Sequence, residues 1–391
     1  MVGPRVRHVL DTRTPLPLTT IRSETVPLAP RVLILTASVG EGHDLPARTL
    51  AEQIRNERPD AEVITRDALE SMGRLVKAIS ADAPRLVFFR FQWVWDLGFW
   101  FFAGFGPTRR GTQALLSRLG GRGLARMIDG IDPDVIACTY PNTTEVLGRL
   151  RRDGRLRVPV CAAITDLAAM HYWASPGIDV HMITHPESAA EVREVAGDST
   201  EVQCVHGLTA PEFLAPHDQR ATRASLGLPL DGKIVLVSGG GWGVGDVDGA
   251  VEDALAVDGV VEVVCLCGHN DALRDRIGAR FAAENRVRVE GFTDRMHDWM
   301  AAADVLVHST GGLTVLEALM LGLPPISYGW GRGHVRVNNA AFRRFGLATV
   351  AGTRDELAPA LRRALAGGRL PVNGFHGLPS AASVVLDRAV S

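Results

Sequence analysis

The sequence predicts an α/β protein built from two parallel-sheet domains in tandem. Three observations support this: a length of 391 residues, a hydrophobic fraction of 46%, and two successive series of β-branched runs alternating with amphipathic helical runs. A chain of this length is too long to fold around one ordinary hydrophobic core. Strand–helix alternation is typical of parallel sheets that are covered by helices on both faces.

The first series begins at Arg31, after a polar, proline-broken segment over residues 1–30 that we expect to be a disordered lead-in without a signal peptide. Short buried runs, each followed by a helical pattern, predict strands: Val32–Ala37, Val63–Thr65, Val135–Cys138, Val158–Ile164 and Val202–Val205. The pattern loosens over Gly207–Pro216. We therefore expect a first domain at 31–210, a linker at 211–230 and a second domain at 231–391.

The second series has the same organisation. Its predicted strands are Ile234–Val237, Val261–Leu266, Val287–Val289, Val305–Val307 and Pro325–Ser327, with helices beginning at Asp248, Asp271, Asp294, Leu313 and Val335. Each series is expected to form a Rossmann-like domain. Because ligands bind at the carboxyl ends of such strands, the two binding edges should face each other across a cleft.

Composition narrows the class of protein. The net charge is -2, so no general basic field attracts nucleic acid. Five cysteines are scattered through apolar runs, as expected for reduced thiols of a cytoplasmic protein. We expect the sulfurs of Cys265 and Cys267 to point to opposite faces of a strand, so we interpret them as core. No metal-ligand cluster is apparent, and neither a metal nor a cofactor is expected.

A nucleotide site is predicted where the strand ending at Val307 meets the next helix. Small residues there allow a ligand close to the backbone, and the free amides and dipole of the helix favour a diphosphate. Glu317 lies one turn after Thr314, where a carboxylate can accept ribose hydroxyls. An ordinary glycine-rich turn is the alternative. The expected diphosphate contacts are Ser309, Thr310, Gly311, Gly312, Leu313 and Thr314.

This segment resembles a known motif. The run from Ser309 to Glu317, followed by Gly-Leu-Pro, is similar to the donor-binding motif of the MurG-type glycosyltransferases and of the monogalactosyldiacylglycerol synthases. The resemblance implies the two-domain GT-B fold and a UDP-sugar donor. Within Val289–Met296 it implies that the Phe292 backbone reads uracil, with Met296 in the same segment, and that Glu317 holds the ribose.

Of two further segments, one resembles the donor site of this family and the other departs from it. Ser238–Gly243 looks like its glycine loop, which would place Gly241 and Trp242 beside the donor phosphates. No G-x-G-x-x-G spacing fits, so nicotinamide chemistry is set aside. In Gly331–Asn339, His334 and a valine replace the Gln-Glu pair that contacts the sugar in galactolipid synthases, while Asn338 remains. These changes leave the sugar undetermined, because polar-group matching dominates such discrimination.

The first domain supplies a candidate base. His43 follows the first strand, at the mouth of a strand–helix loop, and imidazole is the usual proton acceptor near neutral pH. A lone histidine is more often structural. The loop resembles the G-x-G-G-H of MurG, which implies that His43 is the catalytic base and that Gly42 lies beside the acceptor. Glu41 replaces a glycine of the family pattern.

Two more acceptor residues come from the same resemblance. The segment from Thr165 to Trp173 is similar to a Thr-Asp-x-x-x-x-His region of the galactolipid synthases. This implies that Asp166 and His171 line the acceptor site. A helix cap followed by a surface histidine is an equally good interpretation.

An aromatic segment offers a membrane hypothesis. Phenylalanine and tryptophan crowd the stretch from Phe88 to Phe105, with arginines on both sides. Such a segment, 85–110, would suit the interface of an anionic membrane, and galactolipid synthases have a membrane-associating region at a comparable place. Packing within the domain is the alternative. Charged residues interrupt the run, so a membrane span is excluded.

The sequence thus predicts an inverting hexosyltransferase that moves sugar from a UDP-sugar to a lipid-linked or amphiphilic hydroxyl, such as that of diacylglycerol. It would be cytoplasmic and peripheral on the inner face of the cell membrane. A nucleotide-sugar epimerase of the same fold and a non-catalytic nucleotide-sugar-binding protein are the alternatives.

Overall fold

The computed structural model describes most of the chain from residue 29 onward. Its described residues are 29–390 except 38–40, 79, 81–97, 99–100, 102–104, 168–169, 330, 332, 373–374 and 376; the side chains of Glu41 and His334 are also outside the description. Residues 1–28 of the expected lead-in and most of the aromatic segment therefore lie outside the described residues.

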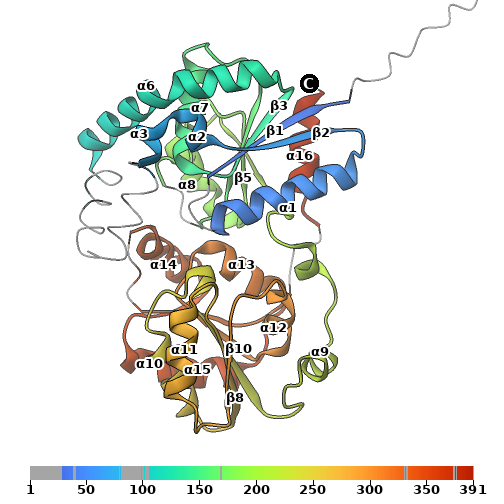
Figure 1. Cartoon of the computed structure of the whole chain (residues 1–391), viewed down its shortest axis with the longest axis vertical. Coiled ribbons are helices and arrows are strands. Elements are labelled where there is room, and N and C mark those ends of the chain that lie inside the picture. Colours follow the sequence, from blue (N-terminus) through green and yellow to red (C-terminus); the bar gives the residue numbers. More distant parts are fainter. Residues whose placement is uncertain are drawn as a thin grey trace, which may run out of the picture.

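Two six-stranded parallel sheets form the centres of two domains (Figure 1). The first has the order β2-β1-β3-β4-β5-β6 and contains β1 (Arg31–Thr36), β2 (Glu62–Asp67), β3 (Val135–Cys138), β4 (Val160–Ile164), β5 (Val180–Ile183) and β6 (Glu201–Cys204). The second has the order β12-β11-β10-β7-β8-β9 and contains β7 (Lys233–Ser238), β8 (Val260–Leu266), β9 (Val287–Glu290), β10 (Val305–His308), β11 (Pro325–Tyr328) and β12 (Thr349–Ala351). The predicted fold class is confirmed.

Helices cover both faces of each sheet. Around the first sheet lie α1 (Glu41–Glu57), α2 (Ala68–Met72), α3 (Arg74–Lys77), α6 (Gly106–Ile131), α7 (Pro141–Arg152) and α8 (Ala189–Ala196). After the short helix η4 (Pro211–Leu214), the second half contains α9 (Gln219–Leu226), α10 (Val247–Leu255), α11 (Asp271–Arg280), α12 (Met296–Ala302), α13 (Gly312–Met320), α14 (His334–Phe345), α15 (Arg354–Gly367) and α16 (Ala381–Ala389).

The apolar runs of the strands are continuous because both sheet faces are buried. In β1, Leu33 and Leu35 pack into a core with α2, α6 and α7, whereas Val32 and Ile34 pack into another with α1. The strand β7 divides its side chains between two cores in the same way. Because successive side chains point to opposite faces, each central strand contributes to the cores on both sides of its sheet.

Two strands were absent from the sequence prediction. The strand β5 contains His181, which breaks the apolar pattern but is completely buried, because its Nε2 accepts the Ser175 amide at 3.2 Å and its Nδ1 meets the Thr200 hydroxyl at 3.1 Å. The strand β12 is a three-residue edge strand that pairs with β11 only. It is too short to produce a pattern of its own.

The last helix returns to the first domain. Ala381, Ala382, Val384 and Val385 of α16 pack in the core that contains β1 and α1, and Figure 1 shows α16 beside these elements. The Ala381 amide also donates to the carbonyl of His206 at 2.9 Å. This helix therefore belongs with the first sheet, and not with the 231–391 domain in which the sequence analysis placed it.

Candidate active site

His43 is held in a defined orientation at the N-terminal turn of α1. Its Nδ1 lies 2.9 Å from the Thr139 carbonyl, and its ring meets Tyr140 edge-on at 5.2 Å. The Thr139 hydroxyl donates back to the His43 carbonyl at 3.0 Å. Because a carbonyl only accepts, Nδ1 must carry the proton, which leaves the lone pair of the neutral ring on Nε2. The orientation therefore suits proton abstraction by Nε2.

The loop around His43 is tied to the ends of neighbouring strands. The Thr165 hydroxyl, after β4, donates to the Gly42 carbonyl at 3.4 Å, and the Thr36 hydroxyl donates to Asp44 Oδ1 at 2.9 Å. The structure thus brings Gly42, His43 and the residue before Asp166 to one edge. His171 is half-buried farther along that segment; burial, and secondly the charge of Arg109, lower its pKa.

The predicted phosphate loops contact each other in the second domain. They follow β7 and β10, which are neighbours in the sheet. Gly240 has a φ of 69°, and a Cβ added there would lie 2.6 Å from Cγ2 of Thr310. A side chain at Gly240 would therefore be both strained and obstructed. This contact places the glycine loop beside the N-terminus of α13.

The hydroxyls of this loop are already engaged. The Ser309 hydroxyl donates to the Tyr328 carbonyl at 2.9 Å, and the Thr310 hydroxyl lies 3.0 Å from Nδ1 of His308. We expected both hydroxyls to donate to the diphosphate. The first-turn amides of α13, from Gly312, Leu313 and Thr314, remain the anion-binding groups of the prediction.

His308 lies directly below this turn and is only 1% exposed. Its Nδ1 accepts the Thr310 amide at 3.2 Å, so Nε2 carries the proton of the neutral ring. Among the residues that the structure describes, Nε2 has no hydrogen-bond partner. Burial lowers the pKa of His308 to about 4, so the imidazole is neutral at pH 7 and supplies no positive charge.

Glu317 is 7% exposed and points toward Thr209, just before the linker. Its Oε1 accepts the Thr209 hydroxyl at 2.5 Å. Burial raises the pKa of the carboxyl group to about 7, although this hydrogen bond acts in the opposite direction. A ribose hydroxyl would compete with Thr209 for the same oxygen. The hydrogen bond from Thr209 to Glu317 was not predicted from the sequence.

Phe292, expected at the base, and Trp242, expected beside the donor phosphates, are exposed aromatic residues. Phe292 is 54% exposed and Trp242 is 41% exposed, and they follow β9 and β7 respectively. The ring of His269, after β8, stacks on Phe292 at 3.9 Å, and its amide donates to the Gly241 carbonyl at 2.8 Å. Met296, which begins α12, packs on the domain core. His269 was missed, although it follows the strand between these two.

Asn338 is completely buried and contacts the first domain. Its Nδ2 donates to Asp166 Oδ1 at 2.9 Å, and its Oδ1 accepts the Leu167 amide at 2.9 Å. We expected Asn338 to contact the donor sugar and Asp166 to line the acceptor site. In the structure, these two residues bind each other across the domain boundary. The side chain of His334 lies outside the described residues.

Two family models match the two halves of this chain. The sequence model of the monogalactosyldiacylglycerol (MGDG) synthases matches residues 43–208, and that of the group 1 glycosyl transferases matches residues 250–367. The chain is 24% identical over 330 residues to a processive diacylglycerol beta-glucosyltransferase of Staphylococcus aureus, covering 83% of this chain and 82% of that protein. 

Solved structures share the fold. MurG of Acinetobacter baumannii aligns with a TM-score of 0.55 at 14% identity, over 92% of this chain and 98% of MurG. The spinosyn rhamnosyltransferase SpnG aligns with a TM-score of 0.59 at 12% identity, over 93% of this chain and all of SpnG (100%). The chain is a glycosyltransferase with the GT-B fold, and it is similar to the MGDG synthases and to MurG. This result favours glycosyl transfer over the epimerase and non-catalytic alternatives.

The expected orientation of Cys265 and Cys267 was wrong. The sulfurs of Cys265 and Cys267 lie 3.8 Å apart, on the same side of β8, because residues two apart on a strand share a face. Both residues are buried in the core. Among the described residues, no group of three or more potential metal ligands comes together.

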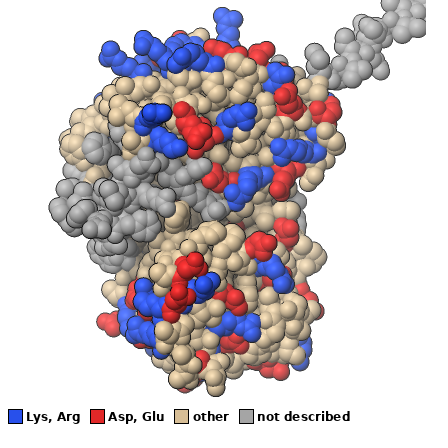
Figure 2. Space-filling model, viewed as in Figure 1, with Lys and Arg blue, Asp and Glu red and all other residues tan. Residues whose placement is uncertain are grey.

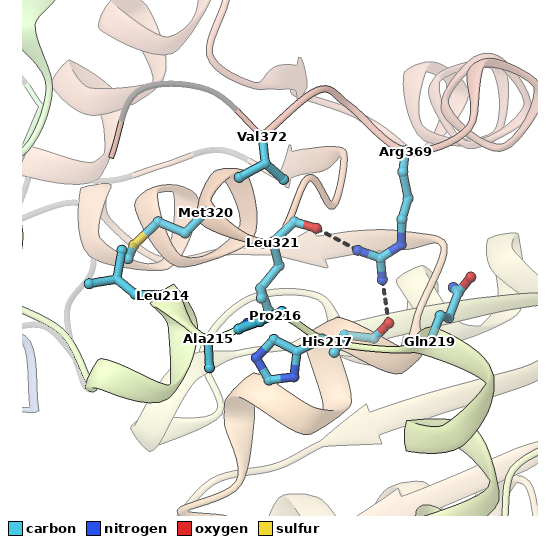
Figure 3. A pocket seen from close by; sticks show the side chains of 10 residues that line it. Leu214, Ala215, Pro216, His217, Gln219, Met320, Leu321, Arg369 and Val372 are labelled. Carbon is cyan, nitrogen blue, oxygen red and sulfur yellow. Dashed lines mark hydrogen bonds between the residues drawn. The ribbon is translucent and has the colours of Figure 1, made fainter. Parts of the chain in front are cut away.

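A cavity of about 390 Å³ is lined by residues outside the predicted phosphate loops, and Figure 3 shows their side chains. It is lined by the linker from Leu214 to Gln219 and by the ends of α12 and α13, which precede β10 and β11. It therefore borders the amino edge of the second sheet. Arg369 donates there to the carbonyls of Leu321 at 2.6 Å and Ala303 at 2.9 Å, and thus caps both helices. Arg369 is therefore a structural residue.

Proposed function

We propose that the protein is an inverting hexosyltransferase that transfers sugar from a UDP-sugar to a diacylglycerol-like hydroxyl. The observation that supports this most directly is the orientation of His43, whose Nδ1 is held by the Thr139 carbonyl. The name of the S. aureus relative supports a diacylglycerol acceptor and a hexose. A further structure with this fold, TcCGT1, was solved with UDP and aligns with a TM-score of 0.51 at 11% identity.

The reaction follows from these groups. His43 Nε2 accepts the proton of the acceptor hydroxyl, whose oxygen attacks the anomeric carbon from the side opposite the leaving group. The bond between that carbon and the diphosphate oxygen breaks, and UDP departs. Amides at the N-terminus of α13 stabilise the charge on the leaving diphosphate. One displacement inverts the anomeric configuration.

Nucleotide titration tests the donor assignment. We expect UDP to stabilise the protein by about 2.7 kcal/mol at about 100 times its dissociation constant. GDP, dTDP and NAD at equal concentration should have smaller effects, as measured by thermal shift and calorimetry. Mass spectrometry of diacylglycerol incubated with the UDP-hexoses then identifies the product. A preference for GDP or dTDP would remove the UDP-sugar assignment.

We also propose that α6 binds an anionic membrane. Its outer face carries three exposed arginines, Arg118, Arg122 and Arg126, together with exposed Leu115 and Leu119. Figure 2 shows basic residues gathered along this end of the molecule. Within the described part of the chain, none of the three arginines has a carboxylate at ion-pair distance. The described aromatics Phe101 and Phe105 are exposed and stacked just before α6. No helix within the described residues is long and apolar enough to cross a membrane.

Vesicle flotation tests this surface. Each basic residue near an anionic membrane contributes about 1 kcal/mol, so Arg118→Glu, Arg122→Glu and Arg126→Glu together should weaken binding by about 100-fold or more. Arg280→Glu and Arg354→Glu form the matched control, because these arginines lie on the second domain and pair with acidic residues. Equal flotation of the triple variant and the wild type on phosphatidylglycerol vesicles would exclude α6 as the membrane surface.

A further inference from the structure

Asp166 lies against the N-terminal turn of α13, where the donor diphosphate of the proposed function would bind. A Cβ added to Gly311 would be 2.9 Å from Asp166 Oδ1, and one added to Gly312 would be 2.7 Å from the Thr165 carbonyl oxygen. The two glycines therefore allow the first domain to approach this closely. A carboxylate is favoured at a helix N-terminus for the same reason as a phosphate. Asp166 therefore places a negative charge where the negatively charged diphosphate would bind.

The contact is firmly held. The completely buried Asn338 donates to Asp166 Oδ1 and accepts the Leu167 amide, each at 2.9 Å. Leu167 is itself completely buried, in an apolar cluster with Val315 of α13 and Phe342 of α14. Two hydrogen bonds and an apolar anchor therefore hold the segment after β4 on the second domain.

A diphosphate at the amides of α13 would be repelled by this carboxylate. Like charges at contact distance repel strongly in a partly buried site. We propose that Asp166 is a gate residue: its carboxylate occupies the N-terminus of α13 in the nucleotide-free enzyme, and the donor diphosphate displaces it together with Leu167. This proposal rests on the proposed donor site at α13, and it differs from the acceptor role that the family resemblance implied for Asp166.

Calorimetry with three ligands isolates the charge effect. Asp166→Asn keeps the size of the side chain and an oxygen that can accept from Asn338, but removes the charge. We expect this variant to bind UDP and pyrophosphate about tenfold more tightly than the wild type, because the charge that repels them is absent. Uridine, which lacks phosphate, should bind both proteins equally.

Arg344→Ala is the matched control. Arg344 of α14 pairs with Glu191 of α8 across the same domain boundary, but at its exposed rim. Its removal loosens the boundary without changing the charge at α13, so UDP affinity should change less than about twofold. A tenfold gain in Arg344→Ala as well would show that domain closure in general, and not the Asp166 carboxylate, limits binding, and would overturn the proposal.

Hydrogen exchange gives a second readout on the wild-type enzyme. The Leu167 amide should exchange faster when UDP saturates the protein, because displacement breaks its bond to Asn338. Slower exchange would overturn the gate. Equal UDP affinity in the wild type and Asp166→Asn would overturn the gate but leave the donor site intact. Absence of UDP and pyrophosphate binding in both proteins would overturn both proposals.

Discussion

Replacing His43 by alanine should lower the turnover number by about 100- to 10,000-fold, the usual contribution of a positioned general base. UDP affinity should change less than about twofold, because His43 belongs to the first domain and α13 to the second.

His217→Ala is the matched control for this variant. His217 Nε2 lies 2.8 Å from the Glu212 carbonyl, beside the cavity at the amino edge of the second sheet. Its removal should leave turnover unchanged. The melting temperature of His43→Ala shows whether loss of the Thr139 contact disturbs the fold. A folded His43→Ala that retains more than about a tenth of the activity would exclude the base assignment.

Glu317 should couple stability to pH in the opposite sense to a paired carboxylate. Burial raises its pKa from the ordinary 4.5 to about 7, so between these values the folded protein holds a proton that the unfolded chain releases. Stability from this group is therefore complete below about pH 4.5 and is lost as pH rises to about 7, by about 1.4 kcal/mol per pH unit. Glu317→Gln should remove this slope in denaturant titrations at several pH values.

The same residue should have the reverse effect on binding. If Glu317 accepts the ribose hydroxyls, Glu317→Ala should weaken UDP binding by about 10- to 150-fold, the range for hydrogen bonds to a charged group. Glu317→Gln would then be more stable than the wild type at pH 8 but weaker in UDP binding. Thr209→Val separates the two roles: it retains the titrating carboxyl group but removes the hydroxyl that competes with the ribose, so its UDP affinity should not fall. Unchanged UDP affinity in Glu317→Ala would remove the ribose role.

Local pattern was sufficient for the architecture. The alternation in β1 and β7 predicts strands that are buried on both faces, and the small residues between Val307 and Glu317 predict the strand–turn–helix at α13. These features depend on neighbours in the chain, and the structure confirms the fold that they indicate. The position of His43 after the first strand is local in the same sense.

The partners of the site residues were decided only by the tertiary structure. Thr209 and Glu317 are separated by 108 residues, and Asp166 and Asn338 by 172. Periodicity shows which side chains are buried but not what covers them, so neither pair could be predicted. The return of α16 to the first sheet has the same cause, because its apolar face would fit either domain. The sequence by itself determined the two sheets and the strand–turn–helix at α13. The tertiary structure determined that the Thr209 hydroxyl lies on Glu317 and that a carboxylate of the opposite domain lies at α13, because both depend on how separately folded layers meet.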